Sequence, residues 1–80
     1  MTNEETLWMG DIEHWMDESF IMKSFIELGF KPQNIKIIID KRITKNRNFG
    51  FVTFNNVQEA NNVLFKLNGK KYQKRTIILN

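Results

Sequence analysis

Phe49 and Phe51 are the residues whose type and spacing point most clearly to a chemistry. They lie in residues 47–54, a run rich in aromatic and β-branched residues that predicts a β-strand. Because successive side chains of a strand point to opposite faces of the sheet, Phe49, Phe51 and Thr53 would share one face. Two rings would then lie where a half-buried strand normally carries polar groups. Exposed rings on a sheet can stack nucleic-acid bases, at about 1–3 kcal/mol per base, so the expected chemistry is base stacking.

Strand alternation predicts that a third ring and several other side chains share this face. In residues 6–10 the same rule turns Trp8 outward, which completes a platform of three rings. The other residues expected at this face are Lys36, Ile38, Thr53, Thr76, Ile78 and Asn80, with Arg47, Lys74 and Arg75 as nearby cations. The cations would hold phosphates, and the polar groups of Thr76 and Asn80, main chain included, would read base edges.

Four predicted strands and two predicted helices would position these side chains. One helix is expected from an N-cap at Asp17 to about Leu28, and a second from Asn55 or Asn56 to Asn68. The strands are expected at residues 6–10, 35–39, 47–54 and 76–79. The order βαββαβ predicts an α+β, ferredoxin-like sandwich, in which a four-stranded antiparallel sheet carries both helices on one face. The other face would stay bare, and the rings point to it.

The segment between the second and third strands has no hydrophobic periodicity. It holds the basic residues Lys41, Arg42, Lys45 and Arg47. We expect a flap over residues 40–48 that contacts phosphate and is mobile without ligand, although the same composition also fits a solvated turn. In the preceding strand, Ile35, Ile37 and Ile39 are expected to point inward.

Composition excludes several classes of function. The 80 residues form one small domain with little core to spare for an enclosed active site. The chain has no cysteine and one histidine, so no metal site is expected. Ser19 and Ser24 lie in the first predicted helix without an identifiable base, so catalysis is not expected either. Its longest apolar runs, such as residues 37–39, are far too short to span a membrane. Residues 1–30 carry seven acidic residues and one lysine, whereas residues 31–80 carry eleven basic and two acidic residues, which suits a phosphate-bearing partner.

Residues 47–54 also fit the RNP1 signature, K/R-G-F/Y-G/A-F-V-x-F/Y, at six of its seven specified positions, and only Asn48 departs from it. The whole chain resembles an RNA-recognition motif (RRM), with residues 7–12 in the place of RNP2. In that family the second residue of RNP2 and the third and fifth of RNP1 stack bases, which implies Trp8, Phe49 and Phe51. The first RNP1 residue, Arg47, would contact phosphate. The longer run 7–18 is similar to the first motif of a subgroup of tRNA-selenocysteine-associated, U-rich-RNA-binding and U1-splicing proteins.

The resemblance implies a non-enzymatic module without a cofactor that binds single-stranded RNA, such as tRNA or U-rich RNA, during tRNA or pre-mRNA processing. The expected location is intracellular, in the nucleus and/or the cytoplasm, without a membrane. Residues 1–80, with a core at about 6–80, would be one monomeric motif of a longer protein. The alternative is a domain whose sheet face binds a peptide or a helix. It rests on the apolar Ile38 and Ile78 and on Asp11, which replaces the Asn common in RNP2.

Overall fold

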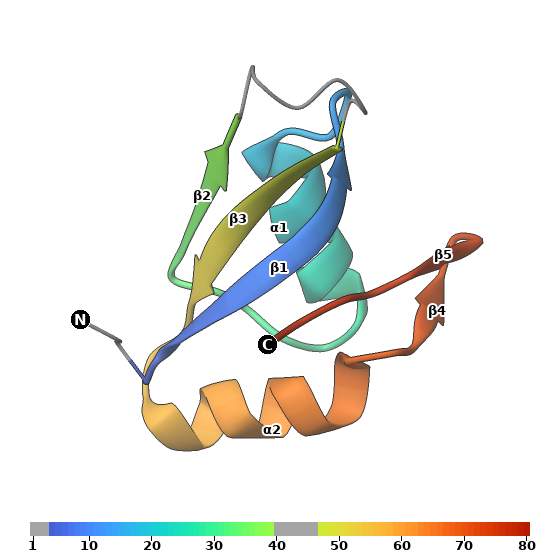
Figure 1. Ribbon diagram of the computed structural model, residues 1–80. Coiled ribbons are helices and arrows are strands. Elements are labelled where there is room, and N and C mark those ends of the chain that lie inside the picture. Colours follow the sequence, from blue (N-terminus) through green and yellow to red (C-terminus); the bar gives the residue numbers. More distant parts are fainter. Residues whose placement is uncertain (1–3, 40–46) are drawn as a thin grey trace.

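Three antiparallel strands form the central sheet of the computed structural model, which describes residues 4–39 and 47–80 (Figure 1). β1 (Thr6–Glu13) and β2 (Asn34–Ile38) both pair with β3 (Arg47–Thr53), so the strand order is β1-β3-β2. The strand with the aromatic signature is therefore central. Its Phe51 is the register partner of Trp8 on one side and of Lys36 on the other.

Both predicted helices are present, and side chains cap them as expected. α1 (Glu18–Glu27) begins after Asp17, whose Oδ1 accepts a hydrogen bond from the Phe20 amide at 2.8 Å. α2 (Val57–Leu67) begins after Asn56, whose Oδ1 accepts from the Glu59 amide at 2.7 Å. Each such cap stabilises a helix by about 1 kcal/mol.

The hydrophobic core fills the space between the sheet and the helices. Most of the inward side chains of the strands are buried as alternation predicts. The rings of Phe25 in α1 and Phe54 after β3 meet edge to face at 5.9 Å. The core also includes Leu7, Ile12, Met16, Ile21, Ile35, Val52, Ala60, Val63, Leu67, Ile77 and Leu79. Because both helices contribute to this one core, the sheet face opposite them is left uncovered by helix (Figure 1).

A β-bulge lengthens β1 beyond the expected residues 6–10. Met9 pairs with Gly50 and Ile12 with Asn48, so Gly10 and Asp11 together oppose a single residue of β3. Asp11 has a φ of 58°. The extra residue shifts the alternation, so that Ile12 joins Leu7 and Met9 on the core side.

The prediction of one continuous last strand over residues 76–79 was wrong in detail. A short hairpin precedes it, made of β4 (Lys71–Tyr72) and β5 (Arg75–Thr76). Residues 78–80 then lie along β1, with the Trp8 amide donating to the Asn80 carbonyl at 2.9 Å and the Gly10 amide donating to the Ile78 carbonyl at 3.0 Å. The chain thus occupies the fourth-strand position, but the hairpin turns residues 75–76 away from β1 (Figure 1).

Two further expectations concern the segment after β2. Ile39 was expected to point inward, but it is 66% exposed, because β2 ends at Ile38 and alternation no longer applies beyond it. The proposed phosphate-contacting flap, with Lys41, Arg42 and Lys45, lies outside the described residues apart from its end. Asn48 lies within β3 and pairs with Ile12, so strand geometry accommodates it without a glycine.

Candidate nucleic-acid interface

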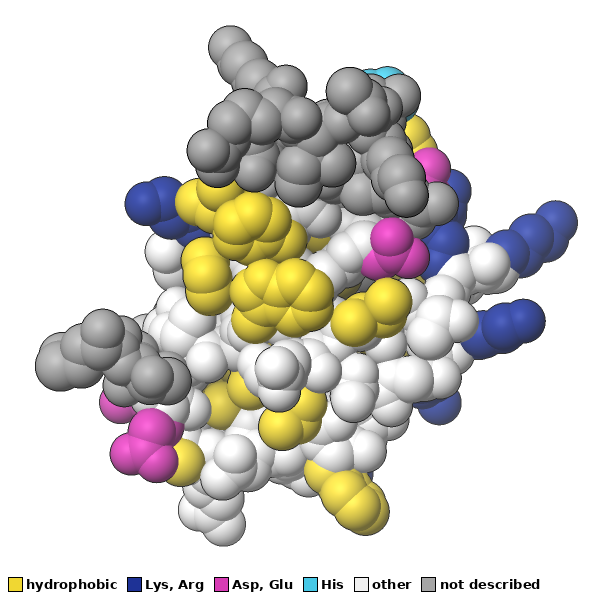
Figure 2. Space-filling model, in the orientation of Figure 1, with side chains coloured by type: hydrophobic (Ala, Val, Ile, Leu, Met, Phe, Trp, Pro, Cys, Tyr) yellow, Lys and Arg dark blue, Asp and Glu magenta, His cyan; other side chains and the backbone are white. Residues whose placement is uncertain are grey.

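The three predicted rings lie together on the uncovered face of the sheet. Trp8 and Phe51 are cross-strand partners with 37% and 38% of their surface exposed, and Phe49 is half-buried beside them. The Trp8 and Phe49 rings are stacked, with centroids 6.3 Å apart and planes 27° from parallel. Phe49 and Phe51 meet edge to face at 6.0 Å. We call these three residues the platform. It forms the centre of the hydrophobic patch in Figure 2.

Gly10 fixes where the Trp8 indole lies. Both residues point to the same face of β1, and the indole extends over the glycine. A Cβ built on Gly10 would lie 2.3 Å from Cη2 of Trp8, which is far inside van der Waals contact. The indole can therefore lie flat along the strand only because position 10 has no side chain, and in that position it stacks on Phe49.

Apolar and hydroxyl side chains border the platform where they were predicted. Ile38 is the register partner of Phe49 and is half-buried, whereas Ile78 lies along β1 and is partly exposed. Thr53 is half-buried at the far end of β3, where its Oγ1 lies 2.9 Å from Oγ1 of Thr6. This hydroxyl pair is already hydrogen-bonded within the protein. Thr53 is therefore a weaker candidate for a base contact than the exposed residues of this face.

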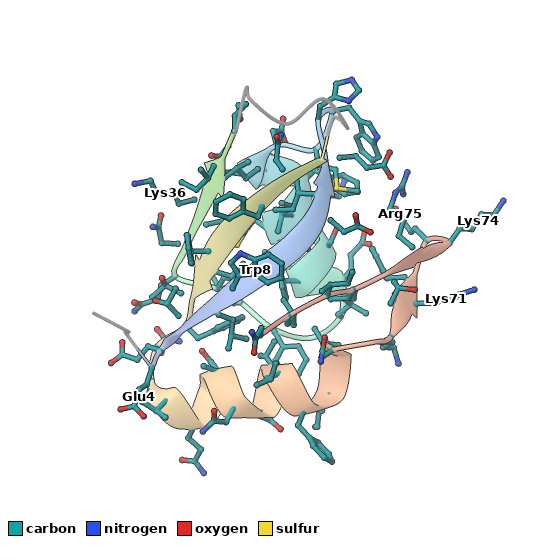
Figure 3. All side chains as sticks on the ribbon, viewed as in Figure 1. Glu4, Trp8, Lys36, Lys71, Lys74 and Arg75 are labelled. Carbon is teal, nitrogen blue, oxygen red and sulfur yellow. The ribbon has the colours of Figure 1, made fainter. Side chains whose placement is uncertain are left out.

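The predicted cations lie on opposite sides of the platform. Lys36 is exposed on β2, directly across from Phe51. Lys74 is exposed at the turn of the β4–β5 hairpin, on the other side of Trp8 (Figure 3). Arg47 begins β3 opposite Glu13. A strand of nucleic acid that crosses the platform from β2 to the hairpin would therefore meet an ammonium group at each side.

Arg75 differs from the other cations because it is engaged within the protein. Its Nε donates to Oε2 of Glu13 at 2.5 Å, and its guanidinium lies 4.8 Å from the ring centre of Trp15. The Trp15 Nε1 donates to Oε1 of Glu13 at 3.2 Å, and its ring meets Phe20 edge to face at 5.0 Å. Arg75 therefore ties the hairpin to the end of β1, and its charge is largely matched by Glu13.

The two residues proposed to read base edges are placed differently from each other. Thr76 is exposed in β5, and Asn80 is exposed at the end of the chain. The main-chain amide and carbonyl of Asn80 both bond to the main chain of Trp8 at 2.9 Å. The main-chain amide was expected to be available to a ligand, and it is not. The side chain of Asn80 stays a candidate for that contact.

A phenol–carboxylate pair makes the second attachment of the hairpin. The hydroxyl of Tyr72 in β4 donates to Oε1 of Glu27 at the end of α1. This hydrogen bond, together with desolvation and the negative charge of Glu27, raises the pKa of Tyr72 above its ordinary value of 10.0. The hairpin is thus fixed to α1 by Tyr72 and to β1 by Arg75.

Several residues of this region had no signal in the sequence. The contact between Glu13 and Arg75 joins positions 62 residues apart, and that between Glu27 and Tyr72 joins positions 45 apart. Trp15 packs on Phe20 and under the guanidinium of Arg75 while remaining 48% exposed.

Within residues 4–39 and 47–80, no group of three or more His, Cys, Asp or Glu side chains could hold a metal ion. None of the described helices is both long enough and apolar enough to cross a membrane.

Comparison with known proteins gives consistent matches. The model of the family described as RNA recognition motif matches residues 7–78. The chain is 40% identical over 65 residues to tRNA selenocysteine 1-associated protein 1 of Danio rerio. The aligned region covers 81% of this chain and 21% of that protein. It is 34% identical over 79 residues to the nuclear and cytoplasmic polyadenylated RNA-binding protein PUB1 of Saccharomyces cerevisiae. Here the aligned region covers 99% of this chain and 17% of that protein.

A solved structure agrees with the sequence matches. The first two RRM domains of the yeast poly(U) binding protein Pub1 superpose with a TM-score of 0.72 at 33% identity, covering 94% of this chain and 44% of that one. The chain spans only about a fifth or less of the curated relatives described above. These matches agree with the resemblance drawn from residues 7–18 and 47–54.

Proposed function

The chain belongs to the RNA recognition motif family, and from this premise we propose that it binds single-stranded RNA across the uncovered face of its sheet. Phe51 and Trp8 stack neighbouring bases, and Phe49 lies against a ribose or between two nucleotides. Lys36 and Arg47 anchor phosphates. The module binds and does not catalyse.

The observation that carries this proposal is the platform itself. Two rings that each expose more than a third of their surface lie side by side on a sheet, with a lysine directly across from one of them. Bases present a flat apolar face and a charged backbone, so they match both features at once. The names of the two curated relatives refer to a tRNA and to polyadenylated RNA, which supports RNA as the nucleic acid.

The test is a fluorescence-anisotropy titration of short single-stranded RNAs with the wild type and Phe51→Ala. Loss of one stacked base should lower affinity about 5- to 150-fold. Phe65→Ala is the matched control, since Phe65 is 88% exposed on α2 and its removal should leave affinity unchanged. Thermal melts of both variants establish that each is folded.

Equal binding by the wild type and Phe51→Ala would refute the stacking role. If RNA does not bind but a peptide or a helix covers Trp8, the sheet face serves protein recognition instead. The apolar Ile38 and Ile78 beside the rings are the features that would suit such a partner.

The setting of this activity is also a proposal. We infer that the chain is one RNA-binding module, with its core in residues 6–80, of a longer protein that acts in tRNA or pre-mRNA processing. The limited share of each relative that it spans supports this inference. An intracellular location, in the nucleus or the cytoplasm, is consistent with RNA as the ligand and with the name of PUB1, which calls that relative a nuclear and cytoplasmic protein.

A further inference from the structure

A chemically reactive pair, Asn68-Gly69, joins the end of α2 to the β4–β5 hairpin. The chain has ten asparagines, and Asn68 is the one that is followed by glycine. Asparagine is a thermolabile residue in proteins. It is labile because the main-chain nitrogen of the next residue can attack the side-chain carboxamide, and glycine carries no side chain to hinder that attack.

The reaction needs water as its only co-reactant. The nitrogen of Gly69 forms a bond to Cγ of Asn68, and the C–N bond of the carboxamide breaks. The carboxamide nitrogen leaves as ammonia, together with the proton that the Gly69 nitrogen gives up. Water then opens the resulting succinimide ring at either of its carbonyls. One product is aspartate, and the other is isoaspartate, whose main chain runs through Cβ and Cγ and is one carbon longer.

The glycine has a structural reason to follow this asparagine. Asn68 ends α2, where its amide donates to the Leu64 carbonyl at 3.1 Å, and Gly69 has a φ of 84°. A left-handed residue directly after a helix is commonly glycine. A Cβ built on Gly69 would have no heavy atom within 4 Å, and both residues of the pair are exposed. Water therefore reaches the pair freely.

Residues 77–79 hold both reacting groups in the folded protein. The Leu79 amide donates to Oδ1 of Asn68 at 2.9 Å, and the Gly69 amide donates to the Ile77 carbonyl at 2.7 Å. The ψ of Asn68 is 125°, which keeps the Gly69 nitrogen turned away from the Asn68 side chain. Ring closure needs that nitrogen and Cβ of Asn68 eclipsed about the Cα–C bond. The attack therefore requires both hydrogen bonds to break and the main chain to rotate.

The segment 77–79 is held by two buried side chains and a short pairing with β1. Ile77 and Leu79 are 9% and 3% exposed, and the Gly10 amide donates to the Ile78 carbonyl at 3.0 Å. Segments with few such contacts open locally without global unfolding. We propose that Asn68 is a self-modification site, and that local opening of residues 77–79 controls its conversion to aspartate and isoaspartate. This inference does not depend on RNA binding.

Isoaspartate at position 68 would prevent the segment from returning to its original place. α2 is fixed in the core by Val63 and Leu67, which are 0% and 3% exposed. After the reactive pair, the Ile77 amide donates to the Lys70 carbonyl at 2.8 Å, beside the bond from Gly69 to Ile77. An additional main-chain carbon between these two anchors shifts one relative to the other, so the bonds to Ile77 cannot both form again. A transient opening would thus become a lasting covalent change.

The first test compares folded protein with protein held unfolded in urea at the same mildly alkaline pH. Peptide mapping by mass spectrometry identifies the converted residue, and released ammonia measures the extent of conversion. Asn68 should convert first among the asparagines of the unfolded chain, and at least about tenfold more slowly in the folded protein. A stable Asn68 in the unfolded chain, or faster conversion of another asparagine, would refute the site. Equal rates in the two states would refute its control by the fold.

Two cavity variants test whether residues 77–79 are the controlling segment. Leu79→Ala removes a buried side chain from that segment, and Ile35→Ala makes a comparable cavity at β2, on the far edge of the sheet. Thermal melts establish that both variants are folded during the assay. Leu79→Ala should accelerate the conversion of Asn68 at least about tenfold, and Ile35→Ala much less. Equal acceleration by two variants of equal stability would show that global unfolding exposes Asn68.

Hydrogen exchange of the wild type gives the same test without a substitution. If local opening controls the reaction, the amide of Gly69 should be protected by about the factor by which folding slows the conversion of Asn68. It should also be protected less than the amides of the central strand β3, which open only in larger unfolding events. Protection of Gly69 equal to that of β3 would contradict local opening.

The effect of isoaspartate is measured on the converted protein after ion-exchange separation. Asn68→Asp is the matched control, because it carries the same charge, keeps an acceptor for the Leu79 amide and has a normal main chain. The isoaspartate form should melt at a lower temperature than Asn68→Asp. It should also bind single-stranded RNA less tightly, a readout that rests on the proposed function, because residues 78–80 lie along β1 beside Trp8. Equal melting temperatures would refute the loss of docking, whatever the result with RNA.

Discussion

Single residues decide what the uncovered face can bind. Exposing apolar surface is unfavourable by about 25 cal/mol per Å², so Trp8 and Phe51 destabilise the free protein relative to polar residues at the same positions. A ligand that covers both rings recovers that free energy. Gly10 contributes by the absence of a side chain, because it lets the indole lie along β1 and stack on Phe49.

The Gly10 contact gives a prediction at this scale. In Gly10→Ala the new Cβ would clash with the indole at 2.3 Å, and the free end of the Trp8 side chain would have to swing away. The fold should persist, but affinity for single-stranded RNA should fall by about the value of one stacked base, 1–3 kcal/mol. Anisotropy titrations measure the loss, and near-ultraviolet circular dichroism reports the displaced indole.

A double-mutant cycle controls for indirect effects of Gly10→Ala. If the substitution acts through the indole, it should have no further effect on affinity in a Trp8→Ala background. A loss of the same size in both backgrounds would show that Gly10 acts by another route.

At the scale of elements, the β4–β5 hairpin is attached through side chains from distant parts of the sequence. Tyr72 bonds Glu27 of α1, and Arg75 bonds Glu13 of β1. The ion pair is partly exposed, with 39% and 29% of the two side chains accessible, so it contributes at most about 1 kcal/mol. Together the two contacts fix the side of the sheet at which the RNA strand would leave the platform.

The Tyr72 contact predicts a pH dependence. Its folded-state pKa is raised above 10.0, so the folded protein holds the phenolic proton more tightly than the unfolded chain does. The associated stability is therefore fully present below pH 10 and is lost as pH rises through the folded-state pKa. Tyr72 is the single tyrosine of the chain, so phenolate absorbance titrates it directly.

Glu27→Gln is the matched variant for this titration. It removes the negative charge that is the partner of Tyr72 and keeps a hydrogen-bond acceptor, so the pKa of Tyr72 should fall toward 10.0. Identical titration curves for the wild type and the variant would mean that the two side chains do not interact in solution.

The elements that local chemistry determines were predictable from the sequence, and those set by distant contacts were not. Asp17 and Asn56 are N-cap residues that predict where the two helices begin. Strand alternation predicts that Trp8, Phe49 and Phe51 share one face of the sheet. The hairpin was missed because Gln73-Lys74 carries no turn signal and its contacts come from positions 45 and 62 residues away. The β1 bulge was missed because it depends on the register with β3.

The site could be predicted in its centre but not at its margins. The shared position of the rings follows from strand alternation alone, because side chains two residues apart in a strand point to the same face of the sheet. Whether a cation is available to RNA depends on its partners in the fold. Arg75 was expected near the RNA, but it is hydrogen-bonded to Glu13, a partner that the sequence does not indicate. The engagement of the Asn80 amide with Trp8 likewise depends on how the end of the chain aligns with β1.

At the scale of the whole molecule, charge is distributed unevenly along the chain and around the platform. The acidic residues fall mainly in the first thirty residues, and the basic ones in the remainder. Lys36 lies on one side of Trp8, with Lys71 and Lys74 on the other (Figure 3). This arrangement suits a strand that crosses the sheet perpendicular to β1 and β3 and meets positive charge at both ends of its path.

Salt dependence tests this distribution. For single strands the logarithm of affinity falls with the logarithm of salt concentration by about 0.7 per phosphate contact. Lys36→Gln should therefore reduce the slope by about 0.7. Lys23→Gln, an exposed lysine on α1, should leave the slope unchanged. Equal slopes for the wild type and Lys36→Gln would place the phosphate path elsewhere.

The most direct test of the central claim is an NMR titration of the folded protein with a short single-stranded RNA. If the uncovered face is the binding surface, the indole signal of Trp8 and the amide signals of Phe49 and Phe51 should shift and saturate together. Amides on the outer side of α2, such as those of Gln58 and Phe65, should stay in place. Saturable shifts confined to α2, or no shift at Trp8 when RNA is bound, would contradict the account.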